Sequence, residues 1–147
     1  MESRDDTIAA IATPPGRGGI GIIKMSGPRS VEIAERIFHP RHASLPLESH
    51  RIYYGEIVHP QTRQTLDEVL VSFMAHPHSY TREDVVEINC HGSPVIMQQI
   101  LAQLVKLGCR LAEPGEFSQR AFFNNRLDLS QAEALAAMVA AKSAKAY

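Results

Sequence analysis

Two apolar runs separated by a short polar segment constrain the fold of this chain most strongly. RIYYGEIV (51–58) and LDEVLVSFMA (66–75) are rich in β-branched and aromatic residues, and HPQTRQT lies between them. This arrangement predicts a β-hairpin. In the second run, apolar side chains occupy most positions of both faces from Val69 to Met74. Such a run is typical of a strand that is covered on both sides.

A glycine-rich stretch, PPGRGGIGII (14–23), contains the spacing G-x-G-x-x-G. In dinucleotide-binding proteins this motif follows a strand, opens a helix and has an acidic residue about 20 positions later. Here the strand-like run IGIIKMS (20–26) follows the glycines, and position 41 is Arg41. We therefore interpret the glycines as a turn between two strands, 6–13 and 20–26, and expect no dinucleotide site.

Two amphipathic helices are predicted in the first 110 residues. The first covers VEIAERIF (31–38), with Ser30 as its N-cap. The second covers PVIMQQILAQLVKLG (94–108), with Ser93 as its N-cap and Gly108 as its end. The faces expected to be buried are Val31, Ala34, Ile37 and Phe38 in the first helix, and Ile96, Ile100, Leu104 and Leu107 in the second.

The C-terminal part of the chain is predicted to be largely helical. After a short strand candidate at CRLAEP (109–114), a short helix is expected near FSQRAFFNN (117–125). An alanine-rich helix over 129–147 follows, beginning with the capping-box pattern Ser130-x-x-Glu133. Because this pattern contains no stop signal, we expect the helix to be the beginning of a longer helical domain.

Strands mixed with helices, including a hairpin, predict an α/β or α+β domain with a mixed β-sheet and packed helices. We assign residues 1–118 to this domain and residues 119–147 to the beginning of the helical domain. A chain of 147 residues with 44% hydrophobic and 21% charged residues is ordinary for a soluble globular protein. Its formal net charge of −1 gives no electrostatic argument for nucleic-acid binding.

Cysteine usage and the N-terminal residues favour a cytoplasmic protein. Cys90 and Cys109 show no CxxC or zinc-ligand spacing, so free thiols in a reducing compartment are expected. The histidines in the proline-containing loops have no further ligands at set spacing, so no metal site is expected. MESRDDTIAA lacks the apolar core of a signal peptide, and no apolar run approaches the roughly 20 residues of a membrane helix.

The segment DVVEINCHG (84–92) carries the most informative polar pattern. The residues alone fit two interpretations, an ordinary strand with one solvated face or a strand that floors a polar pocket. A Cys–His nucleophile is not expected, because strand neighbours point to opposite faces, and Cys90 is expected to be buried and inert. By alternation, the two faces are Val86, Ile88 and Cys90 on one side, and Glu87, Asn89 and His91 on the other.

Three long motifs together resemble the N-terminal region of the tRNA modification GTPases (the MnmE, or TrmE, family). They are DTIAAIATPPGRGGIGIIKMSGP, SYTREDVVEINCHGSPVI and RLAEPGEFSQRAFFNNRLDLSQAEA, which occur in this order and cover nearly all of the chain. The resemblance implies an α/β module similar to the tetrahydrofolate-binding domains of one-carbon enzymes. It further implies that the module binds 5-formyl- or 5,10-methylene-tetrahydrofolate and forms a homodimer contact near the folate.

The same resemblance implies the setting of the whole enzyme. A potassium-stimulated GTPase domain, which uses GTP and magnesium, is inserted into the following helical domain. With an FAD-containing partner of the MnmG family, in a heterotetramer, the enzyme modifies C5 of the tRNA wobble uridine with a one-carbon unit from the folate. These 147 residues contain no GxxxxGK[ST] motif, so we expect no GTP hydrolysis and no catalytic residue in this piece alone.

The folate contacts of the family correspond to Lys24, Glu87 and Arg126 in this sequence. The 2-amino group and the adjacent ring N–H of a pterin form a two-donor edge, which the carboxylate of Glu87 would accept with both oxygens. The two cations suit the carboxylates of the folate or the carbonyl oxygen of the one-carbon group. Relatives can carry Arg at the first cationic position and Lys at the second, and these side chains differ in hydrogen-bond geometry.

Two other functions fit the residues. One is a structural dimerisation module without a ligand. The other is a stand-alone folate-dependent one-carbon domain, which would need its own catalytic group, and the polar row of 84–92 is the one place where the sequence offers it.

Overall fold

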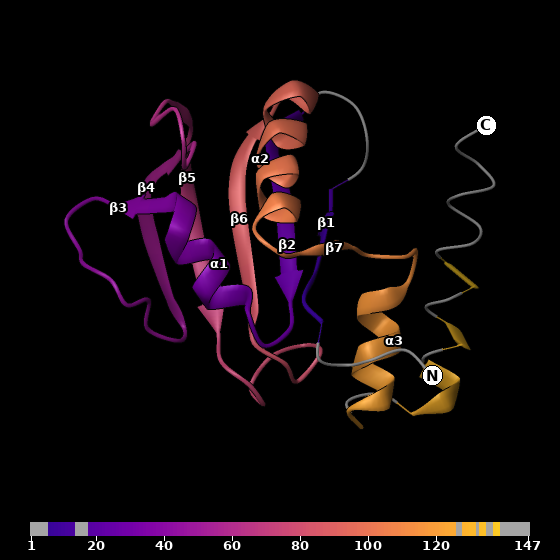
Figure 1. Cartoon of the computed structure of the whole chain (residues 1–147). Helices are drawn as coiled ribbons and strands as arrows, with labels where there is room; N and C mark the ends of the chain where they lie inside the picture. The colour runs from indigo at the N-terminus through magenta and orange to yellow at the C-terminus, as the bar shows by residue number, and fades with distance from the viewer. Residues whose placement is uncertain (1–5, 14–17, 126–127, 132, 135–136, 139–147) are drawn as a thin grey trace.

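A seven-stranded mixed sheet forms the centre of the fold, in the order β3-β4-β5-β6-β2-β1-β7 (Figure 1). The computed structural model describes residues 6–13, 18–125, 128–131, 133–134 and 137–138. The α+β class predicted from the sequence is confirmed. The strands are β1 (Ile8–Ile11), β2 (Gly18–Ser26), β3 (Phe38–Pro40), β4 (Arg51–Val58), β5 (Thr65–Met74), β6 (Val85–Gly92) and β7 (Arg110–Leu111). The helices are α1 (Ser30–Ile37), α2 (Pro94–Lys106) and α3 (Glu116–Phe123).

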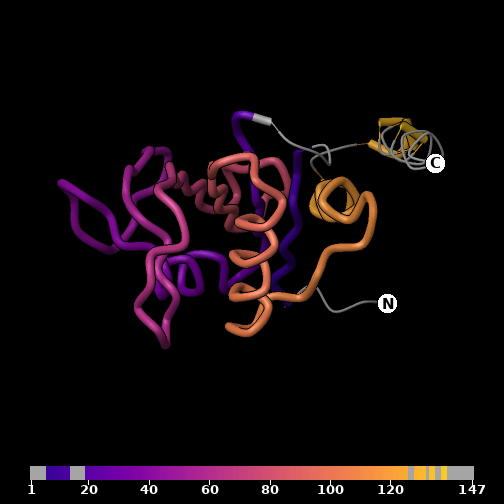
Figure 2. The backbone as a smooth tube through the Cα atoms, turned by 90° about the horizontal axis from the view of Figure 1, so that it is seen from above, coloured from indigo at the N-terminus to yellow at the C-terminus, as the bar shows by residue number. Residues whose placement is uncertain are grey.

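The sheet is antiparallel except where β1 pairs with β7, as far as the described strands show. The predicted hairpin is confirmed, because β4 pairs with β5 from Arg51 opposite Phe73 onward. The strands around the glycine stretch also pair directly, with Ile8 opposite Ser26. Figures 1 and 2 show α3 at the β1 end of the sheet, away from the β4–β5 hairpin. The assigned domain boundary after residue 118 falls within α3 and stays a prediction.

The glycines of the N-terminal stretch belong to a strand more than to a turn. Gly18, Gly19 and Gly21 all lie within β2, while residues 14–17 are outside the described part of the chain. Gly21 faces α2, and a Cβ atom added there would overlap the sulfur of Met97. Its missing side chain therefore allows α2 to approach β2 closely. The strand β2 continues past Gly21 to Ser26, where a dinucleotide-binding motif would open a helix.

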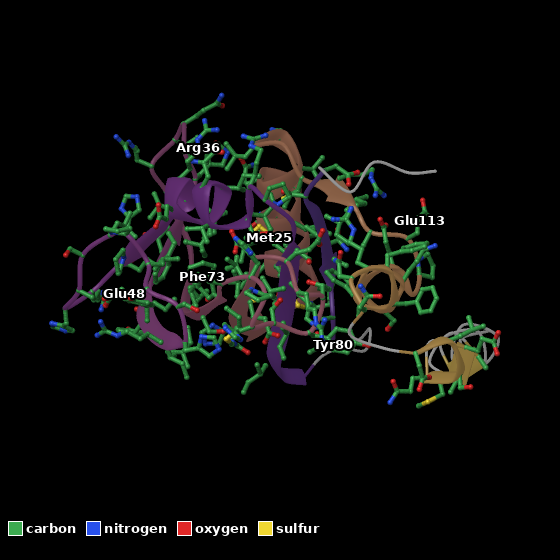
Figure 3. All side chains as sticks on the ribbon, turned by 90° about the horizontal axis from the view of Figure 1, so that it is seen from below. Met25, Arg36, Glu48, Phe73, Tyr80 and Glu113 are labelled. Atoms are coloured by element: carbon green, nitrogen blue, oxygen red, sulfur yellow. The ribbon has the colours of Figure 1, made fainter. Side chains whose placement is uncertain are left out.

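One face of the sheet is buried beneath α1 and α2 (Figure 1). The strand residues that point to these helices alternate with residues that point away, as period-2 geometry requires. Met25 and Phe73, labelled in Figure 3, lie in this core. The helices contribute fully or largely buried side chains to it, namely Ile33, Ala34 and Ile37 from α1, and Met97, Ile100, Leu101 and Leu104 from α2.

The opposite face of the sheet is largely open, which corrects the prediction that the second hairpin strand is covered on both sides. On β5, Val69, Val71 and Phe73 are buried, but Leu70 on the other face is 45% exposed. Ile52 of β4 is 72% exposed on the same side. Both α1 and α2 pack on the other, buried face, so neither of them covers Leu70 or Ile52. We refer to this side of β2, β4, β5 and β6 as the open face.

The helix ends are partly as predicted. Ser93 caps α2, since its side chain accepts a hydrogen bond from the N–H of Ile96. Ser30 is not the cap of α1 but its first residue, and its hydroxyl donates to the carbonyls of Gly27 and Asp84. The helix also ends one residue early, because the expected helical residue Phe38 begins β3.

The predicted buried faces and the C-terminal capping box are shifted. In α2, Ile100 and Leu104 are buried as expected, whereas Ile96 and Leu107 lie at the edge of the core. The capping box is formed by Asp128 and Gln131 instead of Ser130 and Glu133. The N–H of Gln131 donates to the carboxylate of Asp128, and the N–H of Asp128 donates to the side-chain oxygen of Gln131.

Candidate functional site

Glu87 is the first residue of the predicted polar row, and it lies on the open face between two polar residues of the neighbouring strands. It lies on β6 opposite Lys24 of β2 on one side and Ser72 of β5 on the other. The side chain of Glu87 is half-buried, and within the described part of the chain its carboxylate has no hydrogen-bond or ion-pair partner. A half-buried carboxylate is normally paired, because removing it from water without a partner costs free energy. The row therefore offers an acceptor that is ready for a ligand.

Lys24 does not pair with Glu87 but lies between two aromatic rings. Its Nζ is 5.7 Å from the centre of the Tyr80 ring and 5.4 Å from the centre of the Phe117 ring. Both distances are within the range of cation–π attraction. The Tyr80 hydroxyl is 3.0 Å from Oγ of Ser118, which ties the loop before β6 to α3, and Figure 3 shows Tyr80 beside that helix. Sequence reasoning found the cation but missed the two rings, which lie far apart along the chain.

The structure thus brings two of the three predicted site residues together. Lys24 and Glu87 are direct neighbours across the β2–β6 ladder. Arg126 lies outside the described residues, so its place in the site stays a prediction. It follows α3, whose last residue is Phe123.

A buried ion network fastens α3 beside this site. Arg120 of α3 is 5% exposed and donates to the backbone oxygen and the carboxylate of Asp6, and to both carboxylate oxygens of Glu83. Glu83 also accepts a 2.7 Å hydrogen bond from the hydroxyl of the buried Ser26, at the end of β2. The network therefore connects α3 to the same strand that carries Lys24.

Arg110 extends the network along the edge of the sheet. Its guanidinium donates to Asp6 and, with two nitrogens, to Glu116 of α3. Burial opposes the ionisation of Asp6 and Glu116, but the hydrogen bonds from the arginines outweigh it and lower the pKa of both carboxyls. No single motif predicts this network, because its members are spread along the chain from Asp6, before β1, to Arg120 in α3. The one local signal is the pair Glu116 and Arg120 at helical i,i+4 spacing.

His91, the third member of the predicted polar row, is held by an acid that sequence reasoning missed. Both its backbone N–H and its ring Nδ1 lie within hydrogen-bond distance of Asp67, at 2.8 Å and 2.6 Å. The Asp67 side chain is 7% exposed, and it comes from the buried face of β5. A signal was available, because an acid at an inward position of an apolar strand needs a partner.

The two cysteines carry free thiols, as expected from the sequence. Cys90 and Cys109 are free and buried, and burial raises the pKa of each to about 11. Such thiols are poor nucleophiles. Among the described residues, no group of three or more potential metal ligands occurs. None of the helices in that part of the chain has the length and apolar character needed to cross a bilayer.

Comparisons with known proteins point to one family. The family described as "GTP-binding protein TrmE N-terminus" matches residues 7–126. The tRNA modification GTPase MnmE of Syntrophobacter fumaroxidans is 55% identical over 143 residues, which is 97% of this chain. The protein of the same name from Enterococcus faecalis is 52% identical over 142 residues, or 96% of this chain. The chain spans about 30% of the length of the curated relatives it matches.

Proposed function

This chain belongs to the family of the TrmE N-terminus, and from that premise we propose that it is the folate-binding, dimerising part of a tRNA modification GTPase. The relatives with that name extend far beyond this chain. In this proposal the GTPase activity, with GTP, potassium and magnesium, belongs to the remainder of a longer protein. That protein modifies the tRNA wobble uridine at C5 in the cytoplasm, together with an FAD-containing partner of the MnmG family in a heterotetramer.

The unpartnered carboxylate of Glu87 carries the folate assignment. Its two oxygens match the two-donor edge of a reduced pterin, formed by the 2-amino group and the neighbouring ring N–H. Hydrogen bonds from a ligand to an ionised acceptor are worth about 1.5–3 kcal/mol each. The open face beside Glu87 gives a flat ring room to lie on the sheet, because neither α1 nor α2 covers it.

Lys24 supports the same assignment from the neighbouring strand. With its ammonium between Tyr80 and Phe117, the cation is held at the edge of the site at little further cost in side-chain entropy. From there it suits the carbonyl oxygen of a one-carbon group or a carboxylate of the folate. Arg126 is proposed as the second cation of the site. The proposed ligand is 5-formyl- or 5,10-methylene-tetrahydrofolate.

The homodimer is proposed to form through the open face. Ile20, Ile52 and Leu70 expose large aliphatic side chains there, and several such side chains on one face are typical of contact sites in soluble proteins. A second copy seated on this face would cover the apolar residues and enclose the polar row around Glu87. A dimerisation module without a ligand would use the same surface, and it differs from the folate proposal only in leaving the polar row empty.

A titration with 5-formyl-tetrahydrofolate, followed by calorimetry, tests the proposal. We expect the chain to bind, and we expect Glu87→Gln to weaken binding by roughly 10- to 100-fold, as loss of a charge-assisted hydrogen bond predicts. Because Glu87 has no partner to lose within the described residues, its replacement should leave the thermal midpoint unchanged. Glu113→Gln is the matched control, since Glu113 is an exposed acid next to α3.

Two results would contradict the proposal in different ways. Dimer formation without detectable folate binding by the unchanged chain would favour the structural module. If the unchanged chain and Glu87→Gln bind the folate equally strongly, Glu87 does not contact the ligand, although the chain still has a folate site.

A further inference from the structure

Asn89 is a second polar side chain of the open face that has nothing to bind within the described part of the chain. It lies two residues after Glu87 on β6, so both side chains point to the same face. Asn89 is half-buried, and its amide makes no hydrogen bond to any residue that the structure describes. By contrast, every fully buried side-chain nitrogen and oxygen of those residues has a partner. The Asn89 amide therefore reaches solvent on the open face with its donor and its acceptor both unused within those residues.

The residues beside Asn89 on the neighbouring strands are apolar. In the adjacent strands it lies opposite Ile22 of β2 and Leu70 of β5, both aliphatic. It also lines a shallow hollow of about 230 Å³, together with Tyr54, Leu70 and His91. An amide between two aliphatic side chains adds nothing to their packing, whereas it offers a ligand on this face one donor group and one acceptor group.

The spacing between the two side chains fits one flat ligand. Residues i and i+2 of a strand are separated by two rises, or about 6.6 Å. The carboxylate of Glu87 offers two acceptors, and the amide of Asn89 adds a donor on one side of them. A ligand edge complementary to this set presents two donors followed by an acceptor. The edge of a 2-amino-4-oxo pterin has that order, through the 2-amino group, the ring N–H and the 4-oxo group.

We propose that Asn89 is a specificity-determining residue of this site, whose amide N–H donates to the 4-oxo oxygen of a reduced folate. The inference rests on the proposed folate site at Glu87 and adds the group that reads the 4-position of the ring. A 4-amino group in place of the 4-oxo oxygen turns that acceptor into a donor, which then faces the amide donor of Asn89. The same change removes the proton of the neighbouring ring nitrogen, so one contact to Glu87 is lost as well, and only the part of the preference that Asn89→Leu removes belongs to Asn89. The site therefore favours 4-oxo over 4-amino folates.

Competitive calorimetry with two probes tests this, using 5-formyl-tetrahydrofolate and its 4-amino counterpart, 5-formyl-tetrahydroaminopterin. In Asn89→Leu, which keeps the size of the side chain, we expect 5-formyl-tetrahydrofolate to bind about 5- to 10-fold more weakly. The preference for the 4-oxo over the 4-amino probe should fall by the same factor. A residue that only supported the strand would weaken both probes equally and leave the preference unchanged.

Gln99→Leu is the matched control, because it makes the same change of chemistry as removing an amide at Asn89. Gln99 is an exposed amide of α2, on the helical side of the sheet. We expect its replacement to leave both affinities unchanged. Equal loss in Gln99→Leu, or an unchanged 4-oxo preference in Asn89→Leu, would overturn the assignment of Asn89. If Glu87→Gln alone abolishes binding in that case, the folate site stands and only this inference fails. If the unchanged chain does not bind the folate, both fail together.

Discussion

At the scale of single residues, one glycine of β4 is required because the neighbouring strand leaves no room for a side chain. Gly55 lies in β4 opposite Pro40 of β3. A Cβ atom at Gly55 would overlap the carbonyl oxygen of His39 and come within 2.7 Å of the Cα atom of Pro40. These are backbone atoms, so no change of rotamer relieves the contact. The pairing of β3 with the sheet therefore depends on the absence of one methyl group.

We accordingly expect Gly55→Ala to lower the free energy of unfolding by roughly 1–3 kcal/mol, as overpacking does elsewhere. Urea denaturation followed by circular dichroism measures this change. Gly19→Ala is the control, because a Cβ atom there would have no atom within 4 Å. Equal stabilities of the two variants would show that β3 moves aside without cost.

At the scale of elements, α3 is attached to the sheet by its charged side. Its buried residues are Glu116, Arg120 and Ala121, two of which are ionised. A helix normally turns its apolar stripe to the core, and here ion pairs with Asp6, Glu83 and Arg110 take the place of much of that contact. The attachment of α3, and with it the place of Phe117 beside Lys24, is therefore sensitive to protonation.

The acid dependence of stability tests the role of Glu116. Its pKa and that of Asp6 are lowered in the folded protein from ordinary values of 4.5 and 3.8. Their contribution to stability is complete above these values and is lost as the pH falls through the lower values of the folded state. We expect Glu116→Gln to cost about 1–3 kcal/mol at pH 7 and this cost to shrink below pH 4.5, measured by urea denaturation at each pH. Glu113→Gln should show no such cost, and a pH-independent cost in Glu116→Gln would contradict the argument.

The elements that could be predicted from the sequence are those whose pattern is local. The hairpin, β6 and α2 follow from alternation or from a cap with a first-turn proline, and they occur where expected. Glu87 could be placed on a polar face for the same reason. The attachment of α3 could not be predicted, because Asp6 and Glu83 reach Arg120 only through the tertiary fold. The open face was missed because an apolar run looks the same whether a helix or a second molecule covers it.

At the scale of the whole molecule, the core helices cover only one face of the sheet. The core helices bury one face, and the other exposes Ile20, Ile52 and Leu70 around the polar row. In the proposed dimer these residues are covered by the second copy. A charge introduced among them would remain in the contact without a partner, which costs several kcal/mol.

We expect Ile52→Glu to shift the chain from dimer to monomer in sedimentation velocity at micromolar concentration. Val95→Glu is the control, because Val95 is 67% exposed at the start of α2, on the helical side of the sheet. It should sediment like the unchanged chain. A monomer in all three samples would contradict a dimer held by this chain alone, and a dimer in both variants would move the contact to another surface.

The outermost strands of the sheet limit how far this protein can associate edge to edge. Its outermost strands are β3, with three residues, and β7, with two. Strands so short offer few free N–H and C=O groups with which another chain could pair, and this is a common protection against edge-to-edge aggregation. In the proposed dimer, association through the open face would therefore stop at the pair, because neither outermost strand offers a long hydrogen-bonding edge to a further chain.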